Sequence, residues 1–245
     1  MTVLGIDIGG SGIKGAPVDV DGGSLTDERY RLETPRPATP DAVVSVLAEV
    51  AGHWKGNDPM GVTFPGVVRN GVIGTAANLD PSWIGVDAAA LFAEHTGRRA
   101  VVLNDADAAG VAEVAFGAGR DVPGVVLLLT FGTGIGSALF LDGRLVPNTE
   151  FGHLELNGAD AELHASDRIR EEQNLSWTDW GARLQDYLQV VERLLAPDLI
   201  VLGGGVSKKT DRYLPSVKVS TPVVPAVLQN NAGIVGAAMA STGRS

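Results

Sequence analysis

A strand–turn–strand pattern that occurs twice constrains this chain more than any other feature of its sequence. In each copy, an apolar segment runs into a glycine turn, returns as a second apolar segment and reaches an Asp-Gly pair. The copies span residues 3–22 and 125–143. Two copies of one unit predict a duplicated fold in which each half has its own sheet. Pro17, in the second strand of the first copy, predicts that this strand lies at a sheet edge.

Helical and strand patterns alternate along the rest of the chain. Thr39-Pro40-Asp41 combines a capping residue, a proline at the first helical position and an early acid, and so predicts the start of a helix. Ser176, with Asp179 three residues later, predicts the start of a long amphipathic helix. Further strands are expected at 60–64, 67–73, 100–103 and 199–202, and further helices at 87–95, 106–116 and 232–241. The alternation predicts an α/β fold.

The chain length predicts two lobes. A chain of 245 residues approaches the size at which one hydrophobic core divides into two. We expect a first lobe at 1–106, joined by the C-terminal helix 232–245, and a second lobe at 107–231. Ligand clefts of α/β folds open at the carboxyl ends of the strands, so a central cleft shared by the lobes is expected to hold the site.

Composition limits the partners and the compartment. The formal net charge of −10 and the pI near 4.8 oppose binding to nucleic acid or to an anionic membrane, because such binding relies on Lys and Arg. No apolar run has the length of a membrane helix, and the first residues do not resemble a signal peptide, so we expect a cytoplasmic protein. The absence of cysteine excludes disulfides and thiolate zinc sites, whereas carboxylates permit Mg²⁺.

Three glycine turns follow predicted strands, at 9–12, 132–136 and 203–205. Glycine lets backbone N–H groups approach a phosphate without a side chain in the way. A single glycine turn is usually only a turn, but three of them in a duplicated frame favour phosphate binding. None has the Gly-Lys-Ser/Thr ending of a P-loop, and none is a complete dinucleotide-binding motif.

An Asn-Asp pair stands where a strand is expected to end and a helix to begin. Asp105 follows the predicted strand 100–103 and precedes the predicted helix 106–116. One interpretation is a helix cap. The other is a group that accepts a hydroxyl proton during phosphoryl transfer, a role that requires proximity more than a strongly raised pKa. The local sequence leaves both open.

A carboxylate and an imidazole flank Phe151-Gly152, namely Glu150 and His153, and Glu162 follows closely. Paired acceptors of this kind suit a sugar, because one carboxylate can accept hydrogen bonds from two neighbouring hydroxyl groups. A divalent metal site is the alternative, but the His spacing typical of such sites is absent from the sequence.

Together these motifs resemble the ROK family of bacterial sugar kinases, and within it the polyphosphate-using glucokinases and glucomannokinases. The resemblance rests on GIDIGGSGIKG at the start, the ND pair at 104–105, LTFGTGIGSALFLDGRLVPNTEFGH at 129–153 and GGGVS at 203–207. It implies the actin-like ATPase (ribonuclease H-like) duplicated fold, with two lobes and a central cleft. It also implies transfer of a phosphoryl group from inorganic polyphosphate, ATP or both to the 6-hydroxyl of glucose or mannose.

The resemblance assigns roles to individual residues. Asp105 becomes the catalytic base. The residues implied to bind the sugar are Asn104, Asp105, Glu150, His153 and Glu162, with Gly66 and Asn78 as further members. The segments implied to bind donor phosphates are Asp7, Gly9, Gly10, Ser11 and Lys14; Thr130, Gly132, Thr133, Gly134 and Gly136; and Gly203, Gly204 and Gly205. Mg²⁺ is expected near Asp7, and the family usually forms homodimers.

The chain departs from the family at one point, because many members carry a zinc-binding cysteine cluster after the Glu-x-Gly-His segment. Without cysteine, no zinc is expected. The polyphosphate-using branch shares this departure. Polyphosphate also needs a basic path to an acidic protein, and Lys208, Lys209 and Arg212 are the expected path, although such a cluster can also be a solvated turn.

Three alternatives remain at this point. The first is an ATP-only ROK kinase for another sugar, such as mannose, fructose or an N-acetylhexosamine. The second is a non-catalytic sugar-binding or regulatory module, against which Asp105 and the three phosphate segments argue. The third is an actin-like filament or chaperone ATPase, against which Glu150 and His153 argue. A DNA-binding repressor is not expected, because the first phosphate motif begins at residue 3.

Overall fold

The computed structural model describes residues 1–76 and 79–243, and the chain divides into two compact units. Unit 1 comprises Met1–Ala112 and Asn231–Ser245, and unit 2 comprises Glu113–Asn230. The first division falls inside the helix α3 (Asp105–Phe116), whereas the sequence predicts it between residues 106 and 107, near the start of that helix.

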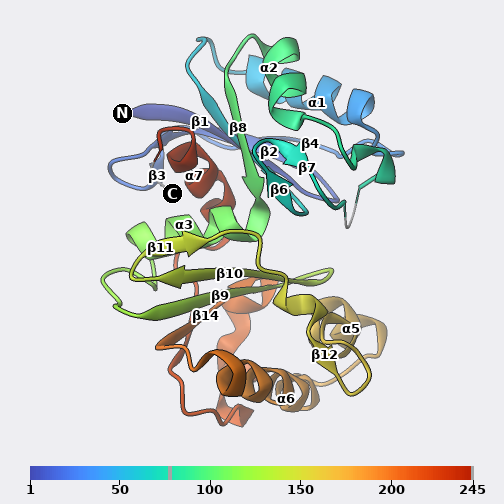
Figure 1. Ribbon diagram of the computed structural model, residues 1–245, viewed down its shortest axis with the longest axis vertical. Helices are drawn as coiled ribbons and strands as arrows, with labels where there is room; N and C mark the ends of the chain where they lie inside the picture. The colour runs from blue at the N-terminus through green and yellow to red at the C-terminus, as the bar shows by residue number, and fades with distance from the viewer. Residues whose placement is uncertain (77–78, 244–245) are drawn as a thin grey trace. The chain divides into compact units, whose positions relative to one another are not determined.

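Unit 1 is built on a six-stranded sheet in the order β3-β2-β1-β5-β8, with β4 also paired to β2 (Figure 1). Its strands are β1 (Thr2–Ile8), β2 (Ile13–Asp19), β3 (Ser24–Leu25), β4 (Tyr30–Leu32), β5 (Met60–Phe64) and β8 (Ala100–Asn104). The pair β1–β2 is antiparallel, whereas β5 runs parallel to β1 and β8 runs parallel to β5. The carboxyl ends of β1, β5 and β8 therefore meet at one edge of the sheet.

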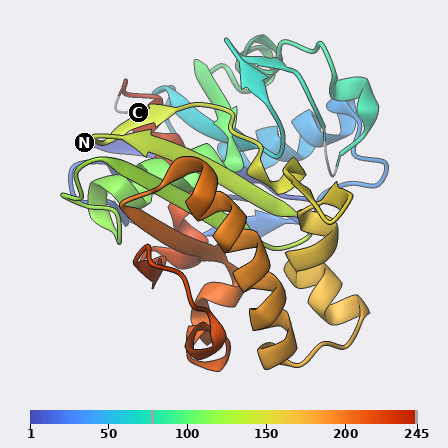
Figure 2. The same cartoon turned by 60° about the horizontal axis from the view of Figure 1, so that its bottom comes forward.

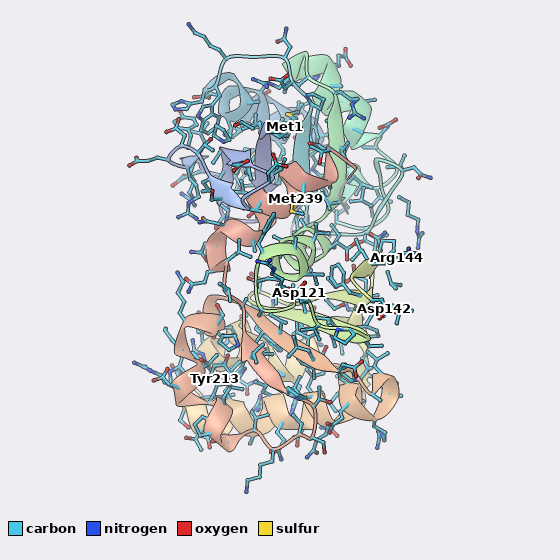
Figure 3. All side chains as sticks on the ribbon, turned by 90° about the vertical axis from the view of Figure 1, so that its left-hand side faces the viewer. Met1, Asp121, Asp142, Arg144, Tyr213 and Met239 are labelled. Carbon is cyan, nitrogen blue, oxygen red and sulfur yellow. The ribbon has the colours of Figure 1, made fainter. Side chains whose placement is uncertain are left out.

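The helices of unit 1 are α1 (Pro40–Gly52), α2 (Ala88–Thr96), most of α3 and α7 (Ala232–Ala240), with a short 3₁₀ helix η1 (Pro81–Trp83). The helix α7, which carries the labelled Met239 in Figure 3, consists almost entirely of small and aliphatic residues. A Cβ added at Gly5 would overlap the carbonyl oxygen of Ile234, and one added at Gly61 would overlap that of Ala237. Glycine in β1 and β5 thus lets the backbone of α7 lie directly on the sheet.

Unit 2 has a five-stranded sheet in the order β11-β10-β9-β14-β15. Its strands are β9 (Val125–Phe131), β10 (Ile135–Leu141), β11 (Arg144–Val146), β14 (Leu199–Gly204) and β15 (Val223–Pro225). As in unit 1, an antiparallel hairpin is followed by parallel neighbours. Asp142, labelled in Figure 3, lies in the turn between β10 and β11, and the labelled Arg144 is the first residue of β11. The repeated topology agrees with the duplication that the sequence predicts.

The remaining elements of unit 2 are α4 (Glu162–Ala165), α5 (Asp167–Glu172), α6 (Trp177–Leu195), β12 (Glu155–Leu156), β13 (Ala159–Asp160), η2 (Phe151–His153), η3 (Gly205–Arg212), η4 (Leu214–Ser216) and η5 (Gln229–Asn231), the last of which ends at the boundary with unit 1. The long helix α6, orange in Figure 2, covers one face of the sheet. Its fully buried Trp180 and Tyr187 pack edge-on against Phe131 of β9. Large aromatic side chains therefore fill the core here, in contrast to the glycine contacts under α7.

Two local predictions were wrong. The segment 67–73 is not one strand but the hairpin β6 (Val68–Arg69) and β7 (Val72–Ile73), because Asn70 and Gly71 both have positive φ and form a tight turn. The strand that contains Pro17 is not at an edge. Its neighbour β4 pairs with residues 13–15 and its neighbour β3 with residues 18–19, so the missing N–H of Pro17 falls between the two paired segments.

The helices within residues 1–76 and 79–243 include none with the length and hydrophobicity that crossing a membrane requires.

Candidate active site

The first glycine turn joins β1 to β2 in unit 1. The Gly9 N–H donates to the Gly12 carbonyl at 3.0 Å, and the Thr34 hydroxyl donates to the Gly9 carbonyl. The Arg31 guanidinium donates to the Ser11 carbonyl at 2.7 Å. A Cβ at position 12 would overlap that guanidinium, so a side chain there would displace the end of Arg31 from this position.

Asp7, beside this turn, is held by two partners. Lys14 Nζ lies 2.9 Å from Asp7 Oδ2, and the Thr63 hydroxyl donates to Asp7 Oδ1 at 2.6 Å. The Asp7 and Lys14 side chains are only 17% and 27% exposed, so their charges are weakly screened. Asp7 and Lys14 lie directly opposite each other in the β1–β2 register, which places both side chains on the same face.

The residues around Asp7 fit a magnesium ion. Mg²⁺ takes oxygen ligands and is usually bound through one or two carboxylates together with substrate phosphates. Asp7 supplies one carboxylate and Thr63 a neighbouring hydroxyl oxygen. Within residues 1–76 and 79–243, no group of three or more His, Asp or Glu side chains gathers as a metal site, so the metal alternative for Glu150 and His153 gains no support.

Asn104 and Asp105 stand at the junction of β8 and α3, at the same sheet edge as Asp7. Asn104 Oδ1 accepts the N–H groups of Ala106 at 2.8 Å and Asp107 at 3.0 Å, so Asn104 caps α3. Asp105 Oδ1 accepts the N–H of the adjacent Ala106 at 2.8 Å. The geometry therefore gives the capping role to Asn104, which weakens that interpretation for Asp105.

The sugar-binding candidates of unit 1 lie beside this cap. The Asn104 amide donates to the Gly66 carbonyl at 3.1 Å, which fixes the side-chain orientation. A side chain at Gly66 would overlap the Thr75 carbonyl, so glycine is required for this close approach. Asn78 lies outside the described residues.

The second glycine turn joins β9 to β10 in unit 2. The Gly132 N–H donates to the Gly134 carbonyl at 3.0 Å, and Glu162 Oε2 accepts the Ile135 N–H at 3.2 Å. A Cβ at Gly134 would overlap the Glu162 carboxylate. Thr130 lies opposite Gly136 in the register, and Thr133 is in the turn itself. Glu162, predicted as a sugar ligand, thus also supports the second glycine turn.

Glu150 precedes the short helix η2 and His153 is its last residue, both close to Glu162. Burial raises the pKa of Glu150, an effect that His153 reduces and Glu162 increases. His153 Nδ1 lies 2.9 Å from Asp160 Oδ2, and this hydrogen bond is the main cause of the raised pKa of His153. With Nδ1–H donated to Asp160, Nε2 of the neutral ring is an acceptor. A side chain at Gly152 would overlap the Ile135 carbonyl, which explains the glycine within this motif.

The third glycine segment ends β14, next to the second turn. Gly203 and Gly204 pair in register with Thr130 and Phe131, so both glycine segments share one edge of the unit 2 sheet. The basic residues Lys208, Lys209 and Arg212 follow in η3 and form no ion pair with any residue in the described ranges.

An aromatic side chain supports this basic segment. Lys209 Nζ lies 5.3 Å from the ring centre of Trp177, and Arg170 Cζ lies 4.2 Å from the same ring. Trp177 is also stacked with Tyr213, which follows η3. Cation–π contacts of this kind are favourable at distances up to about 6 Å, so they help to hold η3 against α6.

Sequence reasoning missed three residues that the structure brings to these motifs: Thr63, Arg31 and Asp160. A threonine near the end of the buried strand β5 was the available signal for Thr63. Arg31 and Asp160 had none, because their contacts join segments far apart in the chain or depend on a hairpin.

Unit 1 thus brings together Asp7, Lys14, the first turn and, along the same sheet edge, the Asn104–Asp105 pair; unit 2 brings together the other two glycine segments with Glu150, His153 and Glu162. This duplicated core of an antiparallel hairpin and parallel strands is that of the actin-like ATPase fold. The chain belongs to the ROK family, whose model matches residues 3–167.

Comparison with individual proteins is more specific than the family match. The chain is 53% identical over 239 residues to the polyphosphate glucokinase of Mycobacterium tuberculosis (strain CDC 1551 / Oshkosh), across 97% of this chain and 90% of the relative. It matches the inorganic polyphosphate/ATP-glucomannokinase of Arthrobacter sp. strain KM with a TM-score of 0.96 and 50% identity, over 100% of this chain and 99% of that one.

A more distant structure shares the fold. The ROK family glucokinase from Streptomyces griseus, in complex with glucose and AMPPNP, gives a TM-score of 0.83 at 22% identity and covers 99% of this chain and 100% of that one.

Proposed function

We propose that this protein is a hexose kinase that transfers the terminal phosphoryl group of inorganic polyphosphate or ATP to the 6-hydroxyl of glucose, and also of mannose. The observation that carries the proposal is the 53% identity to a polyphosphate glucokinase over 97% of the chain. The 50% identity to a polyphosphate/ATP-glucomannokinase supports both the dual donor and mannose.

Unit 1 supplies the base in this proposal. Asp105, which stands after β8 where Asn104 already caps the helix, accepts the proton of the attacking hydroxyl. The transition state of phosphoryl transfer is loose, so correct placement of the hydroxyl contributes more than a strong base would. Asp7 would hold Mg²⁺, which neutralises charge on the donor phosphates when bound.

Unit 2 supplies three of the proposed sugar contacts. The pKa values of Glu150 and His153 are each affected by the other and by Glu162, which supports the proposal that the three bind hydroxyl groups of one hexose. Glu150 accepts hydrogen bonds in its ionised form, and burial opposes that ionisation. Two hydroxyl donors from a bound sugar compensate for this cost. Asn104 and Gly66 are the proposed contributors from unit 1.

The donor is held by the three glycine segments. Backbone N–H groups at the first and second turns and at Gly203–Gly205 bind the phosphate oxygens. Lys208, Lys209 and Arg212 extend this surface for the polyphosphate chain, since none of them has an ionic partner among the described residues. We also propose a cytoplasmic homodimer, as the family resemblance implies; size-exclusion chromatography with light scattering tests the dimer.

The deciding experiment is an assay of glucose 6-phosphate formation with Mg²⁺ and either nucleotide-free polyphosphate or ATP. Product from polyphosphate is expected, and mannose is expected to compete with glucose. Product from ATP alone would support kinase activity but contradict polyphosphate as a donor. Absence of product from both donors, while glucose still binds by calorimetry, would instead favour a non-catalytic sugar-binding module.

A further inference from the structure

Four polar side chains form a row across the unit 1 sheet, beside the first glycine turn. Thr63 of β5 pairs in register with Asp7 of β1, Asp7 with Lys14 of β2, and Lys14 with Arg31 of β4. Residues directly opposite each other on neighbouring strands project from the same face. The row therefore places one negative and two positive charges side by side at the edge where β1 ends.

The charges in this row do not balance. Lys14 is paired with Asp7 at 2.9 Å, whereas Arg31 forms no ion pair with any residue in the ranges that the structure describes. Like charges that lie directly opposite across two strands are destabilising. An anion bound at this position would remove that repulsion.

The Arg31 guanidinium is also held at the turn itself. It donates to the Ser11 carbonyl at 2.7 Å. It further occupies the space beside Gly12 that a side chain there would fill. A guanidinium has five N–H donors, so the bond to Ser11 uses one and leaves others to pair with phosphate oxygens in the planar, forked arrangement that suits them.

We propose that Arg31 is a donor-binding residue, which contacts a phosphate of polyphosphate or ATP at the first glycine turn. The inference rests on the proposed function, because that function assigns this turn to the donor. It also gives the glycine at position 12 a role: it makes room for the guanidinium that reaches over the turn from β4. Lys14, already neutralised by Asp7, leaves Arg31 as the net positive side chain of the row.

The alternative is that Arg31 only fastens the turn through its bond to Ser11. The two roles differ in what they predict. A fastening role affects stability and leaves the affinity for phosphate anions unchanged once the protein is folded. If Arg31 binds the donor, its replacement weakens the binding of phosphate anions and makes that binding depend less on salt. The affinity for glucose stays the same.

The test compares Arg31→Gln and Arg31→Lys with the wild type, using Arg193→Gln as the control. Arg193 lies near the end of α6, is exposed, and its replacement changes the net charge equally. Calorimetry measures binding of tripolyphosphate with Mg²⁺ at two salt concentrations, and kinetics measure KM for polyphosphate, ATP and glucose. Thermal melting without ligand reports on folding.

We expect Arg31→Gln to weaken tripolyphosphate binding about tenfold, the factor for losing one charge-assisted hydrogen bond. KM for polyphosphate and ATP should rise by a similar factor, while KM for glucose stays within about twofold. Arg31→Lys should lose less, because it keeps the charge without the fork. Arg193→Gln should bind like the wild type.

Unchanged tripolyphosphate affinity in Arg31→Gln overturns the inference, and a lowered melting temperature with unchanged affinity assigns Arg31 to fastening the turn. If Arg31→Gln does not fold, Arg31→Lys decides by the same affinity measurement. The proposed function fails separately, since its failure is a wild type that makes no hexose phosphate from either donor, whatever the variants bind.

Discussion

The hairpins β1–β2 and β9–β10 have the same frame and different chemistry. Each consists of two seven-residue antiparallel strands joined by a glycine turn, with a parallel strand on the other side of the first strand. The next-to-last residue of the first strand is Asp7 in unit 1 and Thr130 in unit 2, and their register partners are Lys14 and Gly136. One hairpin therefore carries an ion pair where the other is neutral.

In the proposed function, this difference separates two tasks that phosphoryl transfer requires. A carboxylate beside a phosphate turn can bind a metal ion that neutralises the donor. A neutral, glycine-lined turn instead offers backbone N–H groups without a competing negative charge. The duplicated backbone is thus retained while the side chains at matching positions diverge, and unit 2 adds its positive charge from η3 rather than from the hairpin.

The units also differ in how a helix packs on the sheet. The helix α7 approaches β1 and β5 closely enough that Gly5 and Gly61 have no room for a side chain. The helix α6 instead packs on its sheet through large buried aromatic side chains, among them Trp180 and Tyr187. Unit 1 should therefore tolerate added volume under its helix less well than unit 2 tolerates similar changes.

The largest expected effect comes from replacing the proposed catalytic base, which only unit 1 supplies. Asp105→Asn should lower kcat for hexose phosphorylation about 10²- to 10⁴-fold, the usual contribution of a general base. The Kd for glucose, measured by calorimetry, should change little, because the proposed contacts of Glu150, His153 and Glu162 with the sugar remain. As a control, Asp41→Asn in the exposed first turn of α1 should retain activity. Lost glucose binding with unchanged kcat would contradict the role of Asp105.

The next effect tests the contrast in packing. Gly61→Ala should destabilise the protein by about 3 kcal/mol, because the new methyl group overlaps the α7 backbone. Urea unfolding followed by circular dichroism measures this. Gly52→Ala at the end of α1 is the matched control, since nothing lies within 4 Å of its Cβ position. Equal stability of the two variants would mean that α7 does not pack as closely as described.

A smaller effect is expected from reversing the charge of the basic segment in unit 2. Replacing Lys208, Lys209 and Arg212 by Glu should raise KM for polyphosphate about tenfold, the result of losing three exposed charge interactions of about 0.5 kcal/mol each. The increase should shrink at high salt, where exposed charges are screened. ATP should be affected less because it is a shorter anion. Equal increases in KM for both donors would contradict the role of η3 in binding the polyphosphate chain.

The smallest effect concerns the His153–Asp160 pair. Asp160→Asn should lower the pKa of His153, because the hydrogen bond to Asp160 is the main cause of its rise. NMR titration of the ring measures the shift. In the wild type, the pKa of His153 in the folded protein is raised above 6.5. The pair therefore stabilises the folded state fully below pH 6.5, and this contribution is lost as the pH rises through the raised pKa. The stability difference between wild type and variant should therefore shrink at alkaline pH; a constant difference would exclude this linkage.

Much of the architecture was accessible from local sequence patterns. Glycine turns, apolar strands and capping residues act over a few positions, so the sequence predicted the two hairpins and the helix that Ser176 caps. The cap at Ser176 is confirmed, since its hydroxyl accepts the Asp179 N–H. The prediction failed at 67–73, where a two-residue turn reversed a chain that looked like one continuous strand.

The sequence by itself determined the residue types and their local geometry: a carboxylate beside one glycine turn, a hydroxyl beside the other, and an Asp at the start of a helix. Only the tertiary structure decided which distant groups complete them. Thr63 reaches Asp7 because β5 aligns with β1, and Arg31 reaches Ser11 because β4 returns alongside β2. Such partners depend on strand order and register, which are set by burial of the whole apolar pattern rather than by any short segment.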